Sequence, residues 1–194
     1  MNAEYKMITP SVSPEAADPR AKEVLDKALK QVGFIPNMYA NMVNAPAVLD
    51  TYLLGYRQFR EESGFSPPEQ EVVFLAISFE NGCDYCMGAH SFIADAKSKV
   101  PTAVTDAIRN GTKIPDVKLG ALAQFTRAMV QKRGLPTKAD VATFLTAGYT
   151  ERQILYIVLA IAVKTLSNYS NHLFHTQLDE RFASRTWTPP AKAA

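Results

Sequence analysis

The amino-acid sequence predicts an all-helical (all-α) protein that folds as a single domain, a bundle of about eight or nine helices. Glycine and proline recur along the 194-residue chain, and the stretches between them begin and end with residues typical of helix caps. No stretch alternates between apolar and polar residues for long, and no tight turn joins two apolar runs, so strands are not expected. Apolar residues make up 47% of the chain, which is typical of a globular protein and not of a disordered one.

Capping signals define most of the helix boundaries. Asp18 precedes Pro19 in the pattern of an N-cap followed by proline at the first helical position. Further along, capping boxes pair a serine or threonine with an acid or a glutamine three positions later. Glycine follows most of the predicted C-termini. The expected helices cover residues 19–32, 46–62, 67–80, 83–99, 101–110, 116–133, 138–147 and 151–182.

The domain is expected to cover residues 1–185, followed by a flexible tail at residues 186–194. The tail contains the segment Thr188-Pro189-Pro190-Ala191, which does not favour a helix. Chain ends of this kind are poorly ordered unless something holds them.

The charge of the chain is nearly balanced, with 21 lysines and arginines against 19 acidic residues and a net charge of +2. No basic cluster is present, so a nucleic-acid partner is not expected. The N-terminus lacks an apolar signal region, and the longest apolar run, Ile154–Val163, is too short to span a bilayer. We therefore expect a soluble, cytoplasmic protein without a membrane partner.

A weak internal repeat relates two stretches of the sequence. Residues 64–90 align with residues 148–174, and 5 of the 27 positions are identical, while the caps, the apolar residues and one tetrapeptide keep register. Two interpretations stay open: amphipathic helices that resemble each other because each needs an apolar face, or a duplication in which one half is inactive. The positions that match Glu71, Cys83, Cys86 and His90 hold Leu155, Ser167, Ser170 and Phe174.

The only two cysteines, Cys83 and Cys86, lie three positions apart. In a reducing compartment such a pair indicates catalysis or metal binding more than a structural disulfide. Because Gly82 ends the preceding helix, Cys83 should lie at the N-cap of the next helix and Cys86 in its first turn, where the helix dipole favours a thiolate. The pair predicts a redox enzyme in which Cys86 attacks a hydroperoxide and becomes a sulfenic acid. Cys83 then resolves it as a disulfide and meets the external reductant.

Two further side chains are expected to move protons for this pair. His90 follows Cys86 by four residues, which puts both on one helix face, and an imidazole titrates near neutral pH. Glu71 lies on an apolar stripe, so we expect it to be partly buried with a raised pKa. If the two helices form a hairpin about Gly82, Glu71 and His90 are offset along the helix axes by about 5 Å. A water molecule, or a relay through His90, would then have to bridge this distance. Glu80 is the rival acid, nearer to the turn and more solvated.

Together, Glu71, Cys83, Cys86 and His90 resemble the pattern of the AhpD-like alkylhydroperoxidase branch of the carboxymuconolactone decarboxylase superfamily. That pattern is a glutamate, eleven residues, Cys-Xaa-Xaa-Cys, three residues and a histidine. The resemblance is best over residues 33–97, which include the Gly33-Phe34-Ile35-Pro36-Asn37 segment typical of peroxidase-related members. It extends to residues 154–180.

The resemblance implies an all-helical, usually oligomeric enzyme with no bound cofactor and no metal, in which a redox-active disulfide carries the electrons. It implies Cys86 as the sulfenic-acid site, Cys83 as proton donor and resolving thiol, and His90 and Glu71 as the proton relay. Expected partners are a hydroperoxide, further copies of the chain, and a thiol reductant such as a lipoyl protein, thioredoxin or a peroxiredoxin. Some members carry a histidine between the cysteines, where this chain has Tyr85, a phenol that cannot shuttle protons near neutral pH.

Three other functions stay open. A zinc site could combine Cys83, Cys86 and His90 with His172 or His175, although a helical core of this size needs no metal to fold. A lactone decarboxylase or isomerase of the same superfamily would not need both cysteines. A non-enzymatic redox sensor or interaction protein would form a disulfide without turnover. In the main interpretation, His172 and His175 are structural or interface residues.

Overall fold

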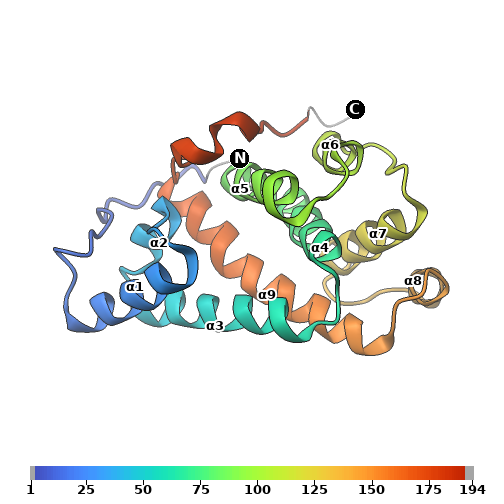
Figure 1. Ribbon diagram of the computed structural model, residues 1–194, viewed down its shortest axis with the longest axis horizontal. Coiled ribbons are helices and arrows are strands. Elements are labelled where there is room, and N and C mark those ends of the chain that lie inside the picture. The colour runs from blue at the N-terminus through green and yellow to red at the C-terminus, as the bar shows by residue number, and fades with distance from the viewer. Residues whose placement is uncertain (1–2, 191–194) are drawn as a thin grey trace.

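The computed structural model describes residues 3–190 and confirms the all-helical fold class (Figure 1). Residues 3–190 contain nine α-helices, one π-helical turn and one 3-10 helix, and they contain no strand. The α-helices are α1 (Pro19–Val32), α2 (Asn37–Met42), α3 (Pro46–Glu62), α4 (Pro67–Glu80), α5 (Asp84–Ile93), α6 (Thr102–Asn110), α7 (Val117–Gln131), α8 (Lys138–Thr146) and α9 (Glu151–Phe174). The π-helical turn η1 (Ala94–Ser98) continues α5, and the 3-10 helix is η2 (Glu180–Arg185). Among the helices described, none combines the length and the apolar character that crossing a membrane requires.

Most of the predicted helix boundaries are confirmed, because local capping bonds set them. The Asp18 side chain accepts a hydrogen bond from a backbone amide in the first turn of α1. Capping boxes headed by Ser66, Thr137 and Thr150 begin α4, α8 and α9. Gly33 ends α1 in the left-handed region, with φ 85. These bonds join residues that are close in sequence, so the sequence alone reveals them.

Two helical segments differ from the prediction. The sequence does not predict α2, a six-residue helix that follows Pro36 and has no side-chain cap. The last helix, α9, ends at Phe174 and not near residue 182, because His175 turns into the left-handed region with φ 50. The next backbone amide then donates to the Asn171 carbonyl, which closes the helix as a glycine usually does. Since no glycine marks this end, the sequence pattern extends the helix too far.

The C-terminal segment predicted to be flexible is anchored where it begins. Trp187 is buried, its ring lies 5.9 Å from the Phe79 ring between centroids, and its Nε1 donates to the Arg109 carbonyl at 2.8 Å. A large apolar ring with a satisfied N–H stabilises the packed position of Trp187, so these contacts hold the start of the predicted tail against α4 and α6. The end of the predicted tail, residues 191–194, lies outside the described residues.

Helix α4 lies at the centre of the fold, between two apolar cores. Its buried side chains contact α6, α7 and α9 in the larger core, while α1, α2, α3 and the start of α5 enclose the second core. Figure 1 shows α9 running obliquely between α3 and the neighbouring helices α4 and α5. Both cysteines belong to the second core, so the candidate site lies close to where the two cores meet.

Candidate active site

The cysteine pair lies where the sequence predicts, at the N-terminal end of α5, but it is not exposed. Gly82, with φ 65, separates α4 from α5, so Cys83 takes the N-cap position and Cys86 lies in the first turn. Both thiols are free, and their residues are 0% and 2% exposed. The sequence also predicts that Cys83 meets the external reductant, but in the structure other side chains cover Cys83 completely. Side chains of α2 and α9, Met38 and Asn171 among them, pack over this end of α5.

Polar side chains of α9 surround the Cys86 sulfur. The Asn171 side-chain amide donates toward both thiols, with Nδ2 3.3 Å from Cys86 Sγ and 3.8 Å from Cys83 Sγ. The Cys86 thiol approaches Ser167 Oγ at 3.9 Å. An N–H donor that points at a sulfur favours the thiolate, and Asn171 lies closer to Cys86 than to Cys83.

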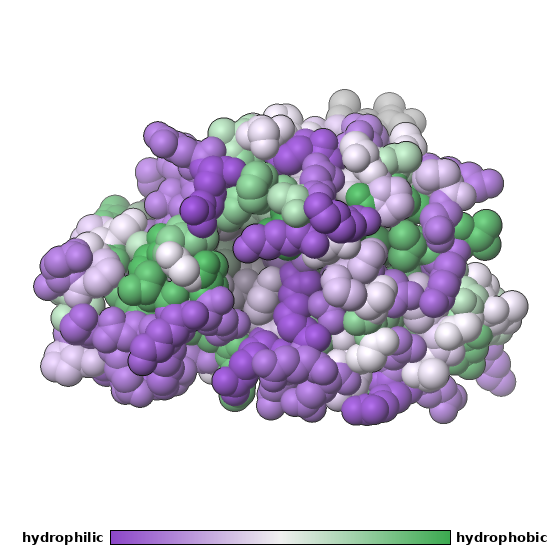
Figure 2. Space-filling view, in the orientation of Figure 1, coloured by the Kyte–Doolittle hydropathy of each residue, from purple (hydrophilic) through white to green (hydrophobic). Residues whose placement is uncertain are grey.

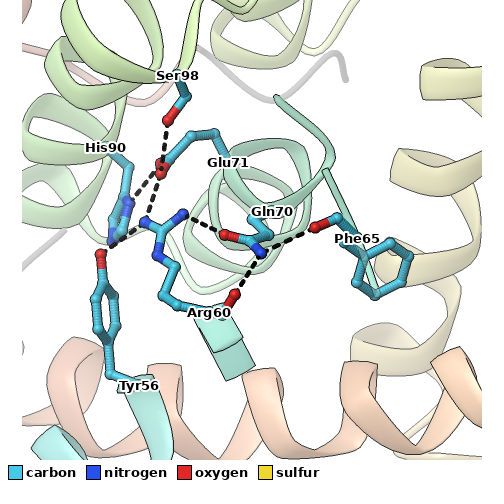
Figure 3. A network of polar contacts seen from close by, with 7 residues as sticks. All are labelled: Tyr56, Arg60, Phe65, Gln70, Glu71, His90 and Ser98. Atoms are coloured by element: carbon cyan, nitrogen blue, oxygen red, sulfur yellow. Dashed lines mark hydrogen bonds and ion pairs between the residues drawn. The ribbon is translucent and has the colours of Figure 1, made fainter. Parts of the chain in front are cut away.

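A second cluster joins His90 to an acid and an arginine (Figure 3). Nδ1 of His90 lies 2.8 Å from Glu71 Oε2, and the Arg60 guanidinium donates to Glu71 Oε1 at 2.5 Å. Arg60 also donates to the Tyr56 hydroxyl at 2.6 Å and to the Gln70 side-chain oxygen at 3.1 Å. Glu71 and His90 are thus in direct contact, and the predicted gap between them is wrong. The rise along two ideal helices gives the offset between the two backbones, but the long side chains of Glu71 and His90 reach across it.

Glu71 is fully buried, yet the pKa of its carboxyl group lies below its ordinary value. Burial alone raises this pKa, as the sequence predicts, but the positive charge of Arg60 and the contact with His90 outweigh burial. The predicted direction is therefore wrong, because the sequence does not show that Arg60 lies beside this acid. For His90, burial and the Lys164 ammonium lower the pKa, although Glu71 opposes them.

A neutral His90 beside an ionised Glu71 has one compatible tautomer. Nδ1 carries the proton and donates to Glu71, which leaves Nε2 as the acceptor; this assignment follows from the hydrogen-bond pattern. His90 lies one helical turn from Cys86 and lines the same cavity. It can therefore take up the thiol proton as a base, and Glu71 stabilises the imidazolium that results.

Lys164, in the middle of α9, is not among the site residues that the sequence predicts. This lysine is 0% exposed, and its ammonium nitrogen makes no hydrogen bond within the described part of the chain. The nitrogen lies 5.6 Å from the centre of the Phe74 ring, and the side chain lines a cavity together with Cys86 and His90. A signal was present: the lysine directly follows the apolar run Ile154–Val163 inside a predicted helix, where a buried charge is costly without a compensating contact.

These surroundings give the two thiols different protonation states. Burial raises the pKa of the Cys83 thiol well above its ordinary value, and the neighbouring Cys86 raises it further. Burial acts in the same direction on Cys86, but the hydrogen bond with Cys83, the Lys164 ammonium and His90 outweigh it and lower the pKa well below its ordinary value. Of the two thiols, Cys86 therefore ionises more readily, and Cys83 is the one that can donate to it.

A cavity of about 360 Å³ leads to Cys86. Side chains of α1, α2, α3, α5, α9 and η2 line it, and Figure 2 shows the surface hollowed where α2, α3 and α5 meet, beside a hydrophobic patch. Cys86, His90 and Lys164 line the cavity, whereas Cys83 does not. A small molecule that enters it meets Cys86 before Cys83.

The remaining candidate residues lie outside this cluster. Glu80 forms an ion pair with Arg127 of α7, so it does not take part in the contacts of His90. His175 Nε2 donates to a backbone carbonyl near the N-terminus at 2.7 Å, and His172 is half-buried in α9. Within residues 3–190, no group of three or more histidine, cysteine, aspartate or glutamate side chains is arranged to hold a metal ion.

Tyr85, between the cysteines, connects α5 to two other segments. Its hydroxyl donates to Asp179 Oδ2 at 2.5 Å, and Asp179 Oδ1 accepts from the Asn37 backbone amide at 3.1 Å. Burial and Asp179 raise the pKa of the Tyr85 phenol, so it stays neutral. Tyr85 therefore holds one wall of the cavity in place and does not move protons.

No family model matches the sequence, and no curated protein matches it. The structure, however, is similar to solved structures. A peroxidase-related protein from Ralstonia eutropha JMP134, described as an alkylhydroperoxidase AhpD core, has a TM-score of 0.78 at 21% identity, covering 90% of this chain and 93% of that one. A peroxidase-related protein from Silicibacter sp. TM1040 has a TM-score of 0.73 at 19% identity, covering 94% and 98%. The debrominase Bmp8, in complex with 2,3,4-tribromopyrrole, has a TM-score of 0.74 at 16% identity, covering 93% and 96%.

These similarities cover nearly the whole chain, at identities that establish a fold and not a reaction. They agree with the resemblance that the Glu71, Cys83, Cys86 and His90 pattern indicates. The protein has the AhpD-like fold of the peroxidase-related proteins.

Proposed function

We propose that this protein is a thiol-dependent peroxidase that reduces alkyl hydroperoxides, with Cys86 as the nucleophile. One observation carries the proposal: of the two thiols only Cys86 lines the cavity, and it does so beside the Lys164 ammonium, His90 and the Asn171 amide. Such surroundings favour the thiolate, which is the form that attacks a peroxide. The fold supports the proposal, since two similar structures are described as peroxidase-related.

In the first step, His90 Nε2 accepts the Cys86 proton and Glu71 stabilises the imidazolium. The Cys86 thiolate attacks the terminal oxygen of the hydroperoxide. An S–O bond forms, the O–O bond breaks, and the alkoxide that leaves takes the proton from His90. The products are an alcohol and a sulfenic acid at Cys86.

In the second step, the Cys83 sulfur attacks the sulfenic acid of Cys86. An S–S bond forms, the S–O bond breaks, and the hydroxyl leaves as water with the Cys83 proton. An external dithiol then reduces the disulfide by thiol–disulfide exchange and is itself oxidised to a disulfide. The short spacing at the start of α5 keeps the two sulfurs close enough for this step.

The burial of the pair restricts the reductant. Because Cys83 is fully buried and Cys86 faces the cavity, an incoming thiolate has to enter the cavity and attack the Cys86 sulfur. A slender dithiol on a flexible arm, such as the dihydrolipoyl group of a lipoyl protein, fits this route. The broad surface around the thiols of thioredoxin or a peroxiredoxin fits it less well.

Steady-state peroxide consumption tests the proposal. Reduced protein is mixed with cumene hydroperoxide, and dihydrolipoamide, thioredoxin or a peroxiredoxin serves in turn as reductant. We expect turnover with dihydrolipoamide, loss of two hydrogens from the protein by mass spectrometry after peroxide alone, and no turnover for Cys86→Ser. A disulfide that forms without turnover on any reductant would favour a redox sensor. A stable sulfinic acid at Cys86 would count against Cys83 as the resolving thiol.

Reductive dehalogenation is the second candidate, because the debrominase Bmp8 shares the fold and the cavity walls here are mainly aromatic. In that reaction the Cys86 thiolate attacks the halogen, His90 protonates the carbon, and Cys83 displaces halide to give the same disulfide. The two candidates differ in product. Halide released from a brominated pyrrole, without alcohol from cumene hydroperoxide, would favour the dehalogenase.

A further inference from the structure

We infer that the cavity binds an aromatic anion: a flat apolar body in contact with the ring-lined walls, with its carboxylate held at the entrance by Lys97 and Arg181. This inference rests on the proposed function for the reacting group that Cys86 attacks. The binding preference itself follows from the cavity and can be tested without turnover.

The walls of the cavity favour an aromatic ligand. Rings dominate the lining: Phe34, Tyr39, Tyr52, Tyr56, Tyr85, Phe92 and Phe182. Several meet at an angle, with the Phe182 centroid 5.4 Å from that of Phe92 and 6.2 Å from that of Phe34. Rings arranged in this way leave edges and faces for a further ring to contact, which adds to the gain from burying apolar surface.

The charges of the cavity have one sign. Lys97, Lys164 and Arg181 line it, and no aspartate or glutamate does so among the described residues. Lys164 is fully buried and lines the inner end of the cavity with Cys86, so it is not available to a group at the entrance. Lys97 and Arg181 form no ion pair within residues 3–190, which leaves two positive charges for an anionic group of the ligand.

Arg181 differs in this respect from the arginine one turn further along. Arg185 forms ion pairs with Asp95 and Asp106, at 3.0 Å and 2.8 Å. The Arg181 guanidinium instead lies over the Phe34 ring, 3.8 Å from its centroid, and forms no ion pair within residues 3–190. An arginine stacked in this way keeps its N–H edge free for a carboxylate.

Two acids precede Arg181: Glu180 is exposed and does not line the cavity, and Asp179 is already engaged. Asp179 accepts hydrogen bonds from the Tyr85 hydroxyl and from the Asn37 amide, one at each carboxylate oxygen. Both Asp179 oxygens are therefore occupied, and neither forms an ion pair with Arg181 within residues 3–190. Lys97 and Arg181 are both exposed, so they can meet a ligand that arrives from solvent.

The volume limits the size of the ligand. About 360 Å³ is at the lower end of the range for small-molecule sites, roughly 300–1,000 Å³. A single substituted ring is therefore a better fit than a long lipid chain. The substrate class that agrees with volume, walls and charge is an aromatic carboxylate that carries the reducible group on its side chain.

Binding of an unreactive pair of probes tests the inference on the full-length reduced protein. Calorimetry compares 4-isopropylbenzoate with its neutral isostere 4-isopropylbenzamide, and with octanoate as a non-aromatic anion. We expect the benzoate to bind roughly five- to tenfold more tightly than the amide, as two exposed ion pairs allow. It should also bind more tightly than octanoate, because only the benzoate places a ring against the aromatic walls. The advantage over the amide should disappear in the Lys97→Gln/Arg181→Gln variant and persist in Lys113→Gln, a matched exposed lysine outside the cavity. Equal binding of benzoate and amide, or equal binding of octanoate, would overturn the inference.

Steady-state kinetics with two hydroperoxides test whether this binding preference affects the reaction. Cumene hydroperoxide and its 4-carboxylate differ only in the anionic group. We expect the carboxylate to have the lower KM at similar kcat, and the Lys97→Gln/Arg181→Gln variant to remove that difference. If neither peroxide is turned over while the benzoate still binds selectively, the proposed peroxidase function fails and the binding inference stands. If both are turned over at equal KM and the benzoate shows no preference, only the inference fails.

Discussion

Residues 64–90 and 148–174 have related sequences but different structures. The first stretch breaks at Gly82, whose positive φ ends α4 and lets α5 begin at the cysteines. The second stretch has Leu166 at the matching position and continues as one helix, α9. The break creates a helix N-terminus, with its free amides and positive end, at the cysteine pair. In the second stretch, α9 continues through the matching residues, so no helix N-terminus lies there.

The second stretch nevertheless contributes to the thiol site. Lys164, which matches Glu80 in the first stretch, lies buried beside Cys86, and Asn171 donates toward both sulfurs. The stretch without cysteines therefore also contributes residues to the site. It supplies charge and donors across the interface between α5 and α9, while the first stretch supplies the sulfur and the histidine.

The largest difference is expected between substitutions at two matched positions, Cys86 in the first stretch and Ser170 in the second. Cys86→Ser should reduce hydroperoxide turnover to the uncatalysed background, because a hydroxyl at this position is not ionised at neutral pH. Ser170→Ala, at the matching position of α9, should change turnover less than about twofold, since that hydroxyl only donates to the Leu166 carbonyl of its own helix. Peroxide consumption with dihydrolipoamide measures both. Equal losses in the two variants would mean that the stretches share the chemistry.

The next effect concerns the proton relay of the first stretch. His90→Phe should slow peroxide reduction by roughly 100-fold, the lower end for general acid–base catalysis, and should raise the Cys86 pKa. Glu71→Gln should act in the same direction but more weakly, since it acts through His90. Alkylation rate against pH measures the shift, and Phe174→Leu, at the position matching His90, is the control. An unmoved titration in His90→Phe would show that the relay is wrongly assigned.

A smaller effect is expected from Lys164. Lys164→Met keeps the length of the side chain and removes the charge, which should raise the Cys86 pKa by about one unit or more. The profile of alkylation rate against pH should therefore shift to higher pH, and the rate should recover as the pH rises. Glu80→Gln, at the matching position, should leave the alkylation profile unchanged. The unfolding temperature serves as the second readout. In Lys164→Met it should stay the same or rise, because Cys86 can take up a proton and no unpaired buried charge is left.

The sequence predicts those parts of the fold and site that depend on neighbours along the chain. Capping bonds span three residues, and Cys83, Cys86 and His90 lie within one short helix, so their spacing is enough to place them. The spacing also indicates that Glu71 belongs with them, but not its contact distance. That distance depends on how two side chains reach across a helix pair.

The rest depends on contacts between segments distant in the sequence. Arg60 reaches Glu71 from α3, and Lys164 and Asn171 reach Cys86 from α9. Those contacts set the pKa of Glu71 below its ordinary value and bury both thiols, against expectation. Lys164 alone left a readable signal, as a charge at the end of an apolar run within a helix.

The smallest effect on catalysis is expected from the outer face of α9. Leu155, Val158, Tyr169 and Leu173 are 70%, 47%, 54% and 40% exposed on one side of this helix, whereas Glu71, which matches Leu155, is fully buried. We expect the stripe to contact a second copy of the chain, because exposed apolar patches of this kind mark interfaces. Leu155→Glu should shift light scattering toward smaller species and change turnover less than about twofold. A monomer for the unchanged protein at working concentration would contradict a homo-oligomer.

The central claim is that Cys86 is held as a thiolate while Cys83 stays protonated. Ultraviolet absorbance of the thiolate, followed against pH in the Cys83→Ser variant, tests this directly, since only one sulfur then titrates and the serine keeps a hydroxyl donor. Lys164 and His90 lower the pKa of Cys86, so the thiolate should persist as pH falls well below the ordinary cysteine value of about 8.5. Adding Lys164→Met should move the midpoint upward. A midpoint at or above the ordinary value in the Cys83→Ser variant, unmoved by Lys164→Met, would contradict the account.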